Sequence, residues 1–355
     1  MKQFYFLACF LLFISTNGNS QTSDVATGFT EPYALALNGN ELFISDLRSG
    51  KLSKIDITTT TKTVIEVITG IENIYGIAIK GNYLYFCDFA NKISKIDITS
   101  SAPAVIDVVT GLNKPISLAF KGNELFIAEW GAGKISKIVD VTVASPIVID
   151  LVTNLNLPTK LAFKDNELYF SLDADGKISK IDDVTASSLI VTDVVGGLTN
   201  PVGIAFKGNE LYISEPMNNT ITDKIYKIDT TENNPILEEV LTGVSGPRGL
   251  VFNGELLYIA ERYAGKVSKL DISTLSINQF DKNNSSMAIF PNPSANNIQI
   301  SGLTKKENYK IYTILGKQVL EGVINNLGKI ITKNLIKGVY LLKFNNGNTL
   351  KFIKK

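Results

Sequence analysis

The feature that most constrains this chain is a sequence unit of 40 to 46 residues that occurs six times in succession. Each unit contains four apolar runs of strand length, which in the third unit are ISLAF, ELFIAE, KISKI and PIVIDLV. Repeats of this length are typical of propellers and solenoids, in which each unit buries its apolar surface against its neighbours. The units span residues 25–66, 67–107, 108–150, 151–193, 194–239 and 240–279.

The residues between the first and second runs favour a β-hairpin in every unit, because they accept the positive φ angles of two-residue turns. A helix over KISKI is disfavoured, since the run is short and β-favouring residues follow it. The predicted turn pairs are Gly39-Asn40, Gly81-Asn82, Gly122-Asn123, Asp165-Asn166, Gly208-Asn209 and Asn253-Gly254.

The second run of each unit predicts how the sheets pack. Leu125, Phe126 and Ile127 are apolar in succession, so both faces of that strand must be covered. Six four-stranded sheets stacked around an axis provide this cover, whereas a single barrel would show alternating apolar and polar residues. We therefore predict an all-β chain that begins with a six-bladed β-propeller. Either residues 23–28 pair beside the last blade and close the ring, or each blade is complete in itself.

The segments PVGIAFKGNELYISE (201–215) and PISLAFKGNELFIAEWGAGKISKI (115–138) resemble NHL-type propeller repeats. The resemblance covers about residues 25–280 and departs from the pattern at Leu172, where the acidic residue is missing and Asp173 follows. It implies the propeller fold, which serves as a binding scaffold, a structural module or occasionally an enzyme.

The strand order predicts a ligand-binding face at one end of the channel, where the loops between fourth and first strands and between second and third strands gather. Its mixture of acids, arginines and an aromatic residue suits a cation, a sugar or a basic peptide. Alternatively, the acid that ends the second strand in five of the six units accepts backbone hydrogen bonds from its own loop. The candidate residues are Glu31, Asp46, Asp88, Glu129, Trp130, Asp173, Glu215, Arg248, Glu261 and Arg262.

If the chain is an enzyme, the propeller fold favours one reaction class. Six-bladed propellers similar to gluconolactonase hold a divalent metal with Glu, Asn and Asp ligands, and this resemblance implies a metal-dependent lactonase as the alternative function. The chain has no histidine, which excludes Ser-His-Asp and zinc–histidine mechanisms. We assign no catalytic residue and no cofactor, and leave open the metal content, with Ca²⁺ in the channel as the candidate.

The N-terminus predicts export. Residues 1–20 read as a signal peptide, with Lys2, an apolar stretch of eleven residues (4–14) and a cleavage site before Gln21. Eleven apolar residues are too few to span a bilayer, and we expect no transmembrane segment. Cleavage leaves Cys87 as the single cysteine, which we expect to be buried in a strand and unpaired.

Charge divides the remaining chain into two domains. Residues 284–355 carry a net charge of +9, and the body between them and the signal peptide carries −9. An acidic body is a poor nucleic-acid partner. We therefore predict a propeller over residues 21–281, a linker over 282–286 and a small β-sandwich over 287–355.

The C-terminal segment begins with FPNP (Phe290, Pro291, Asn292 and Pro293) and continues with IYTILGK, which contains Gly316, and KGVYLLKF, which contains Lys337, Gly338 and Tyr340. Through these residues it closely resembles the type A C-terminal sorting domain of the type IX secretion system of Bacteroidetes. This resemblance implies recognition by the type IX machinery, passage across both membranes, and an extracellular or surface-attached product. We therefore predict an exported cargo whose propeller binds a glycan, peptide or small molecule through the acidic loop face.

Overall fold

The computed structural model describes residues 22–217, 223–273, 288–303, 305–313, 317–344 and 349–355. The predicted signal peptide, the predicted linker and Gly316 lie outside these residues. The described residues form strands and turns without an α-helix, which confirms the all-β prediction. The chain divides into two compact units, Met1–Asp271 and Ile272–Lys355.

The first unit consists, over its described residues, of six four-stranded antiparallel sheets. The first strands are β2 (Pro32–Asn38), β6 (Ile77–Lys80), β10 (Pro115–Lys121), β14 (Pro158–Lys164), β18 (Ile204–Lys207) and β22 (Pro247–Asn253). The second strands are β3 (Glu41–Asp46), β7 (Tyr83–Cys87), β11 (Glu124–Glu129), β15 (Glu167–Leu172), β19 (Glu210–Glu215) and β23 (Leu256–Glu261). The third strands are β4 (Lys51–Asp56), β8 (Ile93–Asp97), β12 (Lys134–Ile138), β16 (Lys177–Ile181), β20 (Asp223–Asp229) and β24 (Lys266–Asp271). The fourth strands are β5 (Ile65–Ile68), β9 (Ile106–Val109), β13 (Val148–Val152), β17 (Val191–Val195), β21 (Glu238–Val244) and β1 (Ser23–Thr27).

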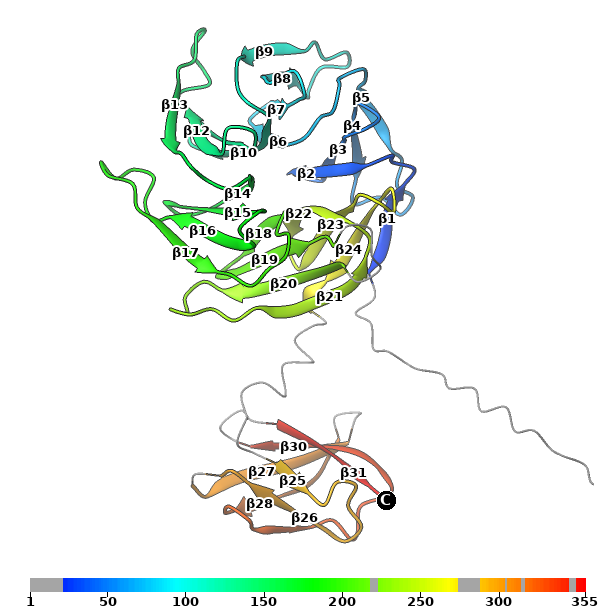
Figure 1. The fold of residues 1–355 in the computed structure, drawn as a ribbon. Helices are drawn as coiled ribbons and strands as arrows, with labels where there is room; N and C mark the ends of the chain where they lie inside the picture. Colours follow the sequence, from blue (N-terminus) through cyan, green and yellow to red (C-terminus); the bar gives the residue numbers. More distant parts are fainter. Residues whose placement is uncertain (1–21, 218–222, 274–287, 304, 314–316, 345–348) are drawn as a thin grey trace, which may run out of the picture. The chain divides into compact units, whose positions relative to one another are not determined.

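The first strands surround a common centre. Each contacts the first strands of the two neighbouring sheets, in the order β2, β6, β10, β14, β18, β22 and back to β2. Figure 1 shows the sheets set around this centre, with the fourth strands on the outside. This closed arrangement is a β-propeller, in which each sheet covers the faces of its neighbours.

The ring is closed by the N-terminal segment. Strand β1 pairs antiparallel with β24 and becomes the fourth strand of the last sheet, which decides between the two closures that the sequence allowed. Val25 and Ala26 of β1 are buried in a core cluster with Leu42 and Ile44 of the first sheet. Hydrogen bonds thus hold the N-terminal segment in the last sheet, and a shared apolar core packs that sheet against the first.

Alternate residues of one strand are buried against different neighbours. Leu125 and Ile127 of β11 pack in the cluster toward the preceding sheet, and Phe126 and Ala128 pack in the cluster toward the following sheet. All four side chains are 0% exposed. This confirms the prediction that the apolar second runs are covered on both faces.

The hairpin turns lie where the sequence predicts them, with one shift. In five sheets the two turn residues are the predicted pairs, and the first of them has a positive φ. In the last sheet β22 extends through Asn253 and β23 begins at Leu256, so the turn is Gly254-Glu255 instead of Asn253-Gly254. The glycine takes the positive φ of 58° there, which the asparagine would adopt less readily.

Cys87 ends β7 and is 0% exposed, as predicted for a structural cysteine. Its Sγ accepts a hydrogen bond from the N–H of Gly76 at 3.1 Å. Burial raises the pKa of the thiol to about 12, so the sulfur stays protonated at neutral pH.

Five third strands are followed by the same Asp-x-Thr turn, in which one carboxylate oxygen accepts hydrogen bonds from the N–H and hydroxyl of the threonine two residues later. These hydrogen bonds lower the pKa of every aspartate below its ordinary value of 3.8. The aspartates are Asp56, Asp97, Asp140, Asp183 and Asp229.

These turns predict an acid-dependent loss of stability. A carboxylate whose folded-state pKa is depressed contributes stability that is complete above pH 3.8 and is lost as the pH falls through the folded-state pKa. We expect the melting temperature to fall in this range, and to fall less steeply when all five aspartates are replaced by asparagine, which accepts hydrogen bonds but does not titrate. Thermal melts from neutral pH downward measure both slopes. Equal slopes in the two proteins would contradict the prediction.

The second unit contains two sheets that share one core. One sheet has the order β25 (Ala288–Phe290), β26 (Asn297–Ser301) and β29 (Lys329–Ile331). The other has the order β28 (Gln318–Ile324), β27 (Glu307–Thr313), β30 (Gly338–Phe344) and β31 (Thr349–Lys354). Ile298 from the first sheet packs in one cluster with Ile311, Leu342 and Phe352 from the second. This arrangement is a β-sandwich.

Candidate functional site

Four of the ten candidate residues are buried carboxylates that hold backbone in place: Asp46, Glu129, Glu215 and Glu261, each no more than 4% exposed. Asp46 accepts hydrogen bonds from the N–H groups of Thr30 and Glu31, both at 2.8 Å. The three glutamates accept equivalent hydrogen bonds in their own sheets. The alternative interpretation of the sequence predicts that these carboxylates accept hydrogen bonds from their own loop, which follows the second strand. They instead fix the loop that leads into the first strand, because antiparallel pairing brings both segments to the same end of the sheet.

Glu31 pairs with two arginines at this end of the channel, the exposed Arg48 and the half-buried Arg262. Its carboxylate contacts Arg48 at 3.1 Å and accepts hydrogen bonds from the guanidinium of Arg262, including one from Nε at 2.8 Å. The Arg262 guanidinium also lies over the Tyr263 ring, 5.4 Å from its centroid. Glu31 and Arg262 therefore form a polar network at the rim whose charges already compensate one another.

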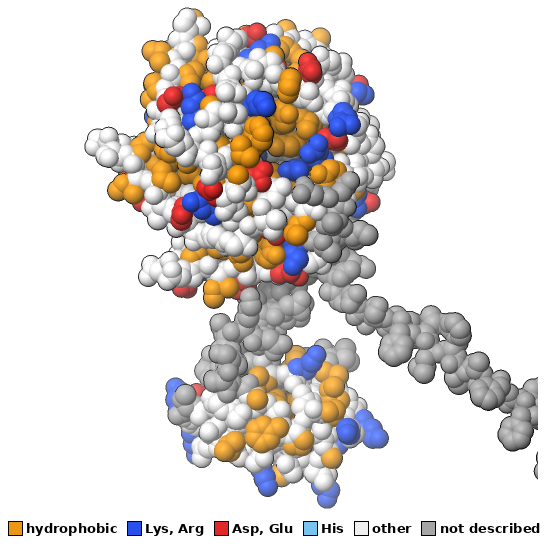
Figure 2. Space-filling model, viewed as in Figure 1, with side chains coloured by type: hydrophobic (Ala, Val, Ile, Leu, Met, Phe, Trp, Pro, Cys, Tyr) orange, Lys and Arg blue, Asp and Glu red, His pale blue; other side chains and the backbone are white. Residues whose placement is uncertain are grey.

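A pocket of about 290 Å³ opens at the same end of the channel. Figure 2 shows hydrophobic and charged side chains gathered together at the centre of this face. The residues that line the pocket come from the innermost strands, from the loops that lead into them and from the loops after second strands: Tyr33, Tyr75, Asp88, Phe89, Asn91, Lys114, Ile116, Trp130, Thr159, Asp173 and Arg248.

Aromatic side chains form much of the pocket wall. The rings of Tyr33 and Tyr75 meet edge to face with centroids 5.4 Å apart. The ammonium of Lys114 lies 5.1 Å from the Trp130 ring centroid, and Phe89 is 50% exposed at the mouth. Such walls offer flat apolar surfaces for a ring-shaped ligand.

The charged groups of the pocket are only partly compensated by one another. The Nε–H of Arg248 is buried and has no hydrogen-bond partner among the described residues. Burial raises the pKa of Asp173, while the positive charge of Arg248 acts in the opposite direction. Burial also raises the pKa of Asp88, whose Oδ1 accepts a hydrogen bond from Ala90 N–H at 2.9 Å. Both carboxylates have thus lost water without gaining a full set of partners.

The structure brings Asp88, Trp130, Asp173 and Arg248 of the ten candidates into this pocket, and the other six lie outside its lining. The sequence analysis missed the remaining pocket residues. Five of the lining residues occupy one repeat position, which is the middle residue of the P-x-G motif or of its equivalent. They are Tyr33, Tyr75, Ile116, Thr159 and Arg248. This position varies between units while its neighbours repeat, and that variation is the signal that identifies a pocket wall.

The described carboxylates at the channel end lie in separate contacts and do not gather into one cluster. Within the described residues, no group of three or more Asp, Glu or Cys side chains is arranged to hold a cation. A calcium ion needs six to eight oxygen ligands, which the separate clamps at the strand ends do not supply.

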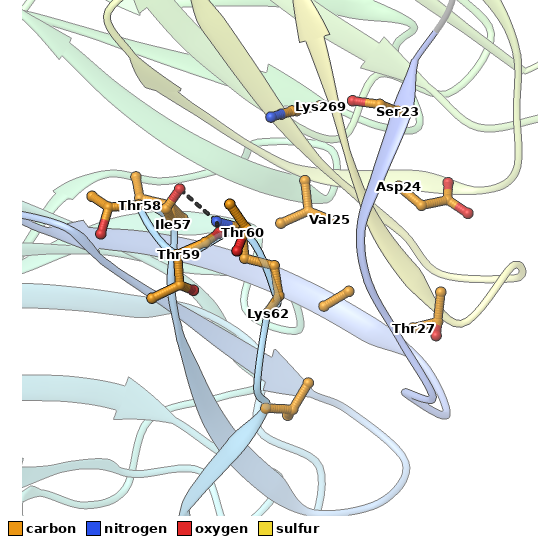
Figure 3. A pocket seen from close by; sticks show the side chains of 12 residues that line it. Ser23, Asp24, Val25, Thr27, Ile57, Thr58, Thr59, Thr60, Lys62 and Lys269 are labelled. Atoms are coloured by element: carbon orange, nitrogen blue, oxygen red, sulfur yellow. Dashed lines mark hydrogen bonds between the residues drawn. The ribbon is translucent and has the colours of Figure 1, made fainter.

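A second depression lies beside β1, outside the channel. Figure 3 shows its lining from β1, from the loop after β4 and from Lys269. Five of its twelve lining residues carry hydroxyl groups, and the ammonium of Lys62 donates a hydrogen bond to the carbonyl of Ile57 at 2.7 Å. Because its lysine is already bonded within the loop and aromatic walls are missing from its lining, this groove offers less to a ligand than the channel pocket does.

In the sandwich, the sorting-motif residue Asn292 connects the start of the domain to its last strand. Its amide donates to the carbonyl of Lys351 at 3.2 Å and accepts from the N–H of Ile353 at 2.9 Å. Tyr340 stacks on Phe352 with ring centroids 5.5 Å apart, and its hydroxyl donates to the carbonyl of Ile336. Asn292 thus ties the start of the domain to its last strand, and Tyr340 helps to pack β30 against β31.

A search for long apolar helices found none that would cross a membrane in the part of the chain that the structure describes.

Comparison with known families identifies the second unit. Residues 288–355 match the model of the secretion system C-terminal sorting domain. This domain marks proteins that type IX secretion exports to the cell surface or the extracellular space, so the chain is a cargo of that route. A search of curated proteins found no significant sequence match.

Solved structures similar to this chain are propeller-like. Virginiamycin B lyase from Staphylococcus aureus is 19% identical, with a TM-score of 0.51 over 71% of this chain and 98% of the lyase. A luciferin-regenerating enzyme is 14% identical, with a TM-score of 0.57 over 70% of this chain and 94% of the enzyme. The PQQ-bound aldose sugar dehydrogenase from Streptomyces coelicolor is 17% identical, with a TM-score of 0.54 over 71% of this chain and 98% of the dehydrogenase. Structural similarity at such low sequence identity supports a shared fold, but it does not assign an activity to this chain.

Proposed function

We propose that the protein is an extracellular binding module, a six-bladed NHL-like propeller that is carried out of a Bacteroidetes cell by its sorting domain and binds a small ligand at the mouth of its channel. The mature propeller would cover residues 21–281, after removal of residues 1–20 and before a linker at residues 282–286. The six four-stranded sheets and the closed ring of first strands support this blade count. The repeat motifs support the NHL-like subtype.

The observation that carries the binding role is the unpaired guanidinium of Arg248 inside a pocket with aromatic walls. A buried charged donor without a partner costs free energy, and a ligand that pairs with it removes that cost. The pocket volume lies near the lower end of the usual range of about 300–1,000 Å³ for ligand sites. The site therefore suits a small molecule or the end of a longer chain.

Binding is tested with the full mature chain on an array of glycans, peptides and small molecules. Ligand found on the array should bind at least about tenfold more weakly to Trp130→Ala, because buried tryptophans carry a large share of binding energy. Isothermal calorimetry measures the ratio.

Tyr83→Ala is the matched control. Tyr83 is also partly exposed and has a lysine, Lys95, 4.9 Å from its ring centroid, but it begins β7 at the opposite end of the sheet. This variant should bind like the parent chain. Binding that survives in Trp130→Ala, or an array without any ligand, would refute the proposed site.

A further inference from the structure

The three arginines of the chain lie at one end of the channel, but only two of them are paired. Arg48 and Arg262 both contact the carboxylate of Glu31. Arg248 makes no ion pair within 4.0 Å and leaves Nε–H without a partner among the described residues. The planar guanidinium is the side chain best suited to bind a carboxylate through two parallel hydrogen bonds. Arg248 is therefore available for an anionic group of a ligand.

The carboxylates of the pocket do not take that role themselves. Asp173 lines the same pocket and senses the charge of Arg248, yet no ion pair forms between the two side chains. The guanidinium of Arg248 and the carboxylate of Asp173 are therefore more than 4.0 Å apart. A group that sits between them would meet a donor on one side and an acceptor on the other.

Asp88 and Asp173 also restrict the rest of the ligand. Both are acceptors whose burial raises their pKa values, so each gains from a hydrogen-bond donor. A purely aromatic acid or an inorganic anion would bring no such donors and would face two acidic side chains. Hydroxyl groups on the ligand would satisfy the two carboxylates.

The aromatic wall defines the body of the ligand. Trp130, Tyr33 and Tyr75 present flat apolar surface to the pocket, against which the C–H face of a six-membered ring packs. A basic peptide would meet the positive charges of Arg248 and Lys114, and an acidic side chain of a peptide would leave this wall uncovered.

We propose that the pocket selects a hydroxylated six-membered ring that carries a carboxylate, which is a uronic acid, with Arg248 pairing the carboxylate, Asp88 and Asp173 accepting ring hydroxyls, and Trp130 packing on the ring. This inference rests on the proposed binding function and names its ligand class. Arg248 is then the residue that determines specificity between an acidic sugar and a neutral sugar of the same shape.

Isothermal calorimetry on the full mature chain tests the inference with D-glucuronate, D-galacturonate, their neutral parents D-glucose and D-galactose, and benzoate. At least one uronate should bind about tenfold more tightly than its neutral parent, which is the size expected for a charge-assisted hydrogen bond. Benzoate should bind more weakly than that uronate. The methyl ester of the uronate should lose the preference, and this comparison needs no change to the protein.

Two variants assign the preference to one residue. Arg248→Gln should bind the uronate and the neutral sugar equally, whereas Arg48→Gln, which alters an exposed arginine already paired with Glu31, should keep the preference. Equal binding of uronate and neutral sugar by the parent chain, tight binding of the ester or of benzoate, or no uronate binding would overturn the inference. A Trp130-dependent array ligand without a carboxylate would overturn this inference alone and leave the binding function standing.

Discussion

Removal of residues 22–27 is expected to destabilise the propeller by more than about 3 kcal/mol, a large part of the total of about 5–15 kcal/mol typical of a folded domain. The deletion takes away β1, the fourth strand of the last sheet, together with its backbone hydrogen bonds to β24. Each lost hydrogen bond costs about 0.5–1.5 kcal/mol, and exposure of a buried valine costs about 1.5–3 kcal/mol. Val25 is that valine, and it is only 8% exposed.

Loss of β1 also uncovers the first sheet. Leu42 and Ile44 of β3 share a cluster with Val25, Ala26 and the last sheet, so the deletion exposes apolar surface on both sides of the closure. Strand β24 becomes a free edge, which favours pairing between molecules. We expect a lower urea midpoint and concentration-dependent association.

Urea unfolding of the mature chain and of the deletion variant measures the effect. Asp24→Ala is the control, because it removes only the exposed ion pair between Asp24 and Lys266 and should cost about 0–1 kcal/mol. If the deletion variant kept the parental midpoint, the N-terminal strand would have no role in closing the ring.

Most of the fold could be predicted from the sequence, because short local patterns of residues determine the turns and the buried strands. The hairpin turns follow from glycine, asparagine and aspartate chemistry, and the doubly buried second strands follow from uninterrupted apolar runs such as Leu125 to Ile127. Ring closure is different, because residues 23–28 and 275–280 both read as parts of a fourth strand. Pairing across more than 240 residues decides between them, and no local pattern reports it.

The site was less predictable because an acidic residue in a sequence does not reveal where its carboxylate points. Glu129 and Asp88 occupy equivalent repeat positions, at the end of β11 and directly after β7, yet Glu129 clamps the N–H of Asn113 while Asp88 reaches the pocket. Four units share a clamp to an N–H group 16 residues earlier, whereas Asp88 accepts a hydrogen bond from Ala90 in its own loop. Variation within a regular repeat is the better guide, since Tyr33, Thr159 and Arg248 differ at one position around which the units otherwise agree.

Gly203→Ala tests whether the same repeat motif that builds the channel also positions Arg248. A Cβ at Gly203 would lie 1.8 Å from the carbonyl oxygen of Arg248 and 2.7 Å from Oγ of Ser214. The backbone carbonyl cannot rotate away as a side chain would, so the innermost strands of the two sheets must separate. Overpacking of this kind costs about 1–3 kcal/mol, occasionally more.

The hydrogen bonds at this contact explain why separation would reach the pocket. The N–H of Gly203 donates to Oγ of Ser214 at 2.7 Å, and that hydroxyl donates to the carbonyl of Arg248 at 3.3 Å. One added methyl group therefore pushes directly on the backbone that carries the unpaired guanidinium. We expect both a lower urea midpoint and a loss of at least about tenfold in binding of the pocket ligand, because small displacements disrupt a paired guanidinium.

Gly196→Ala is the matched control in the same unit, since a Cβ at Gly196 would meet no atom within 4 Å. It should change stability by no more than about 0.5 kcal/mol and leave binding unchanged. Equal midpoints for the two alanine variants would show that the first strands are not packed as closely as the glycine contact requires. A destabilised Gly203→Ala variant with full ligand affinity would instead separate the packing role of the motif from the positioning of Arg248.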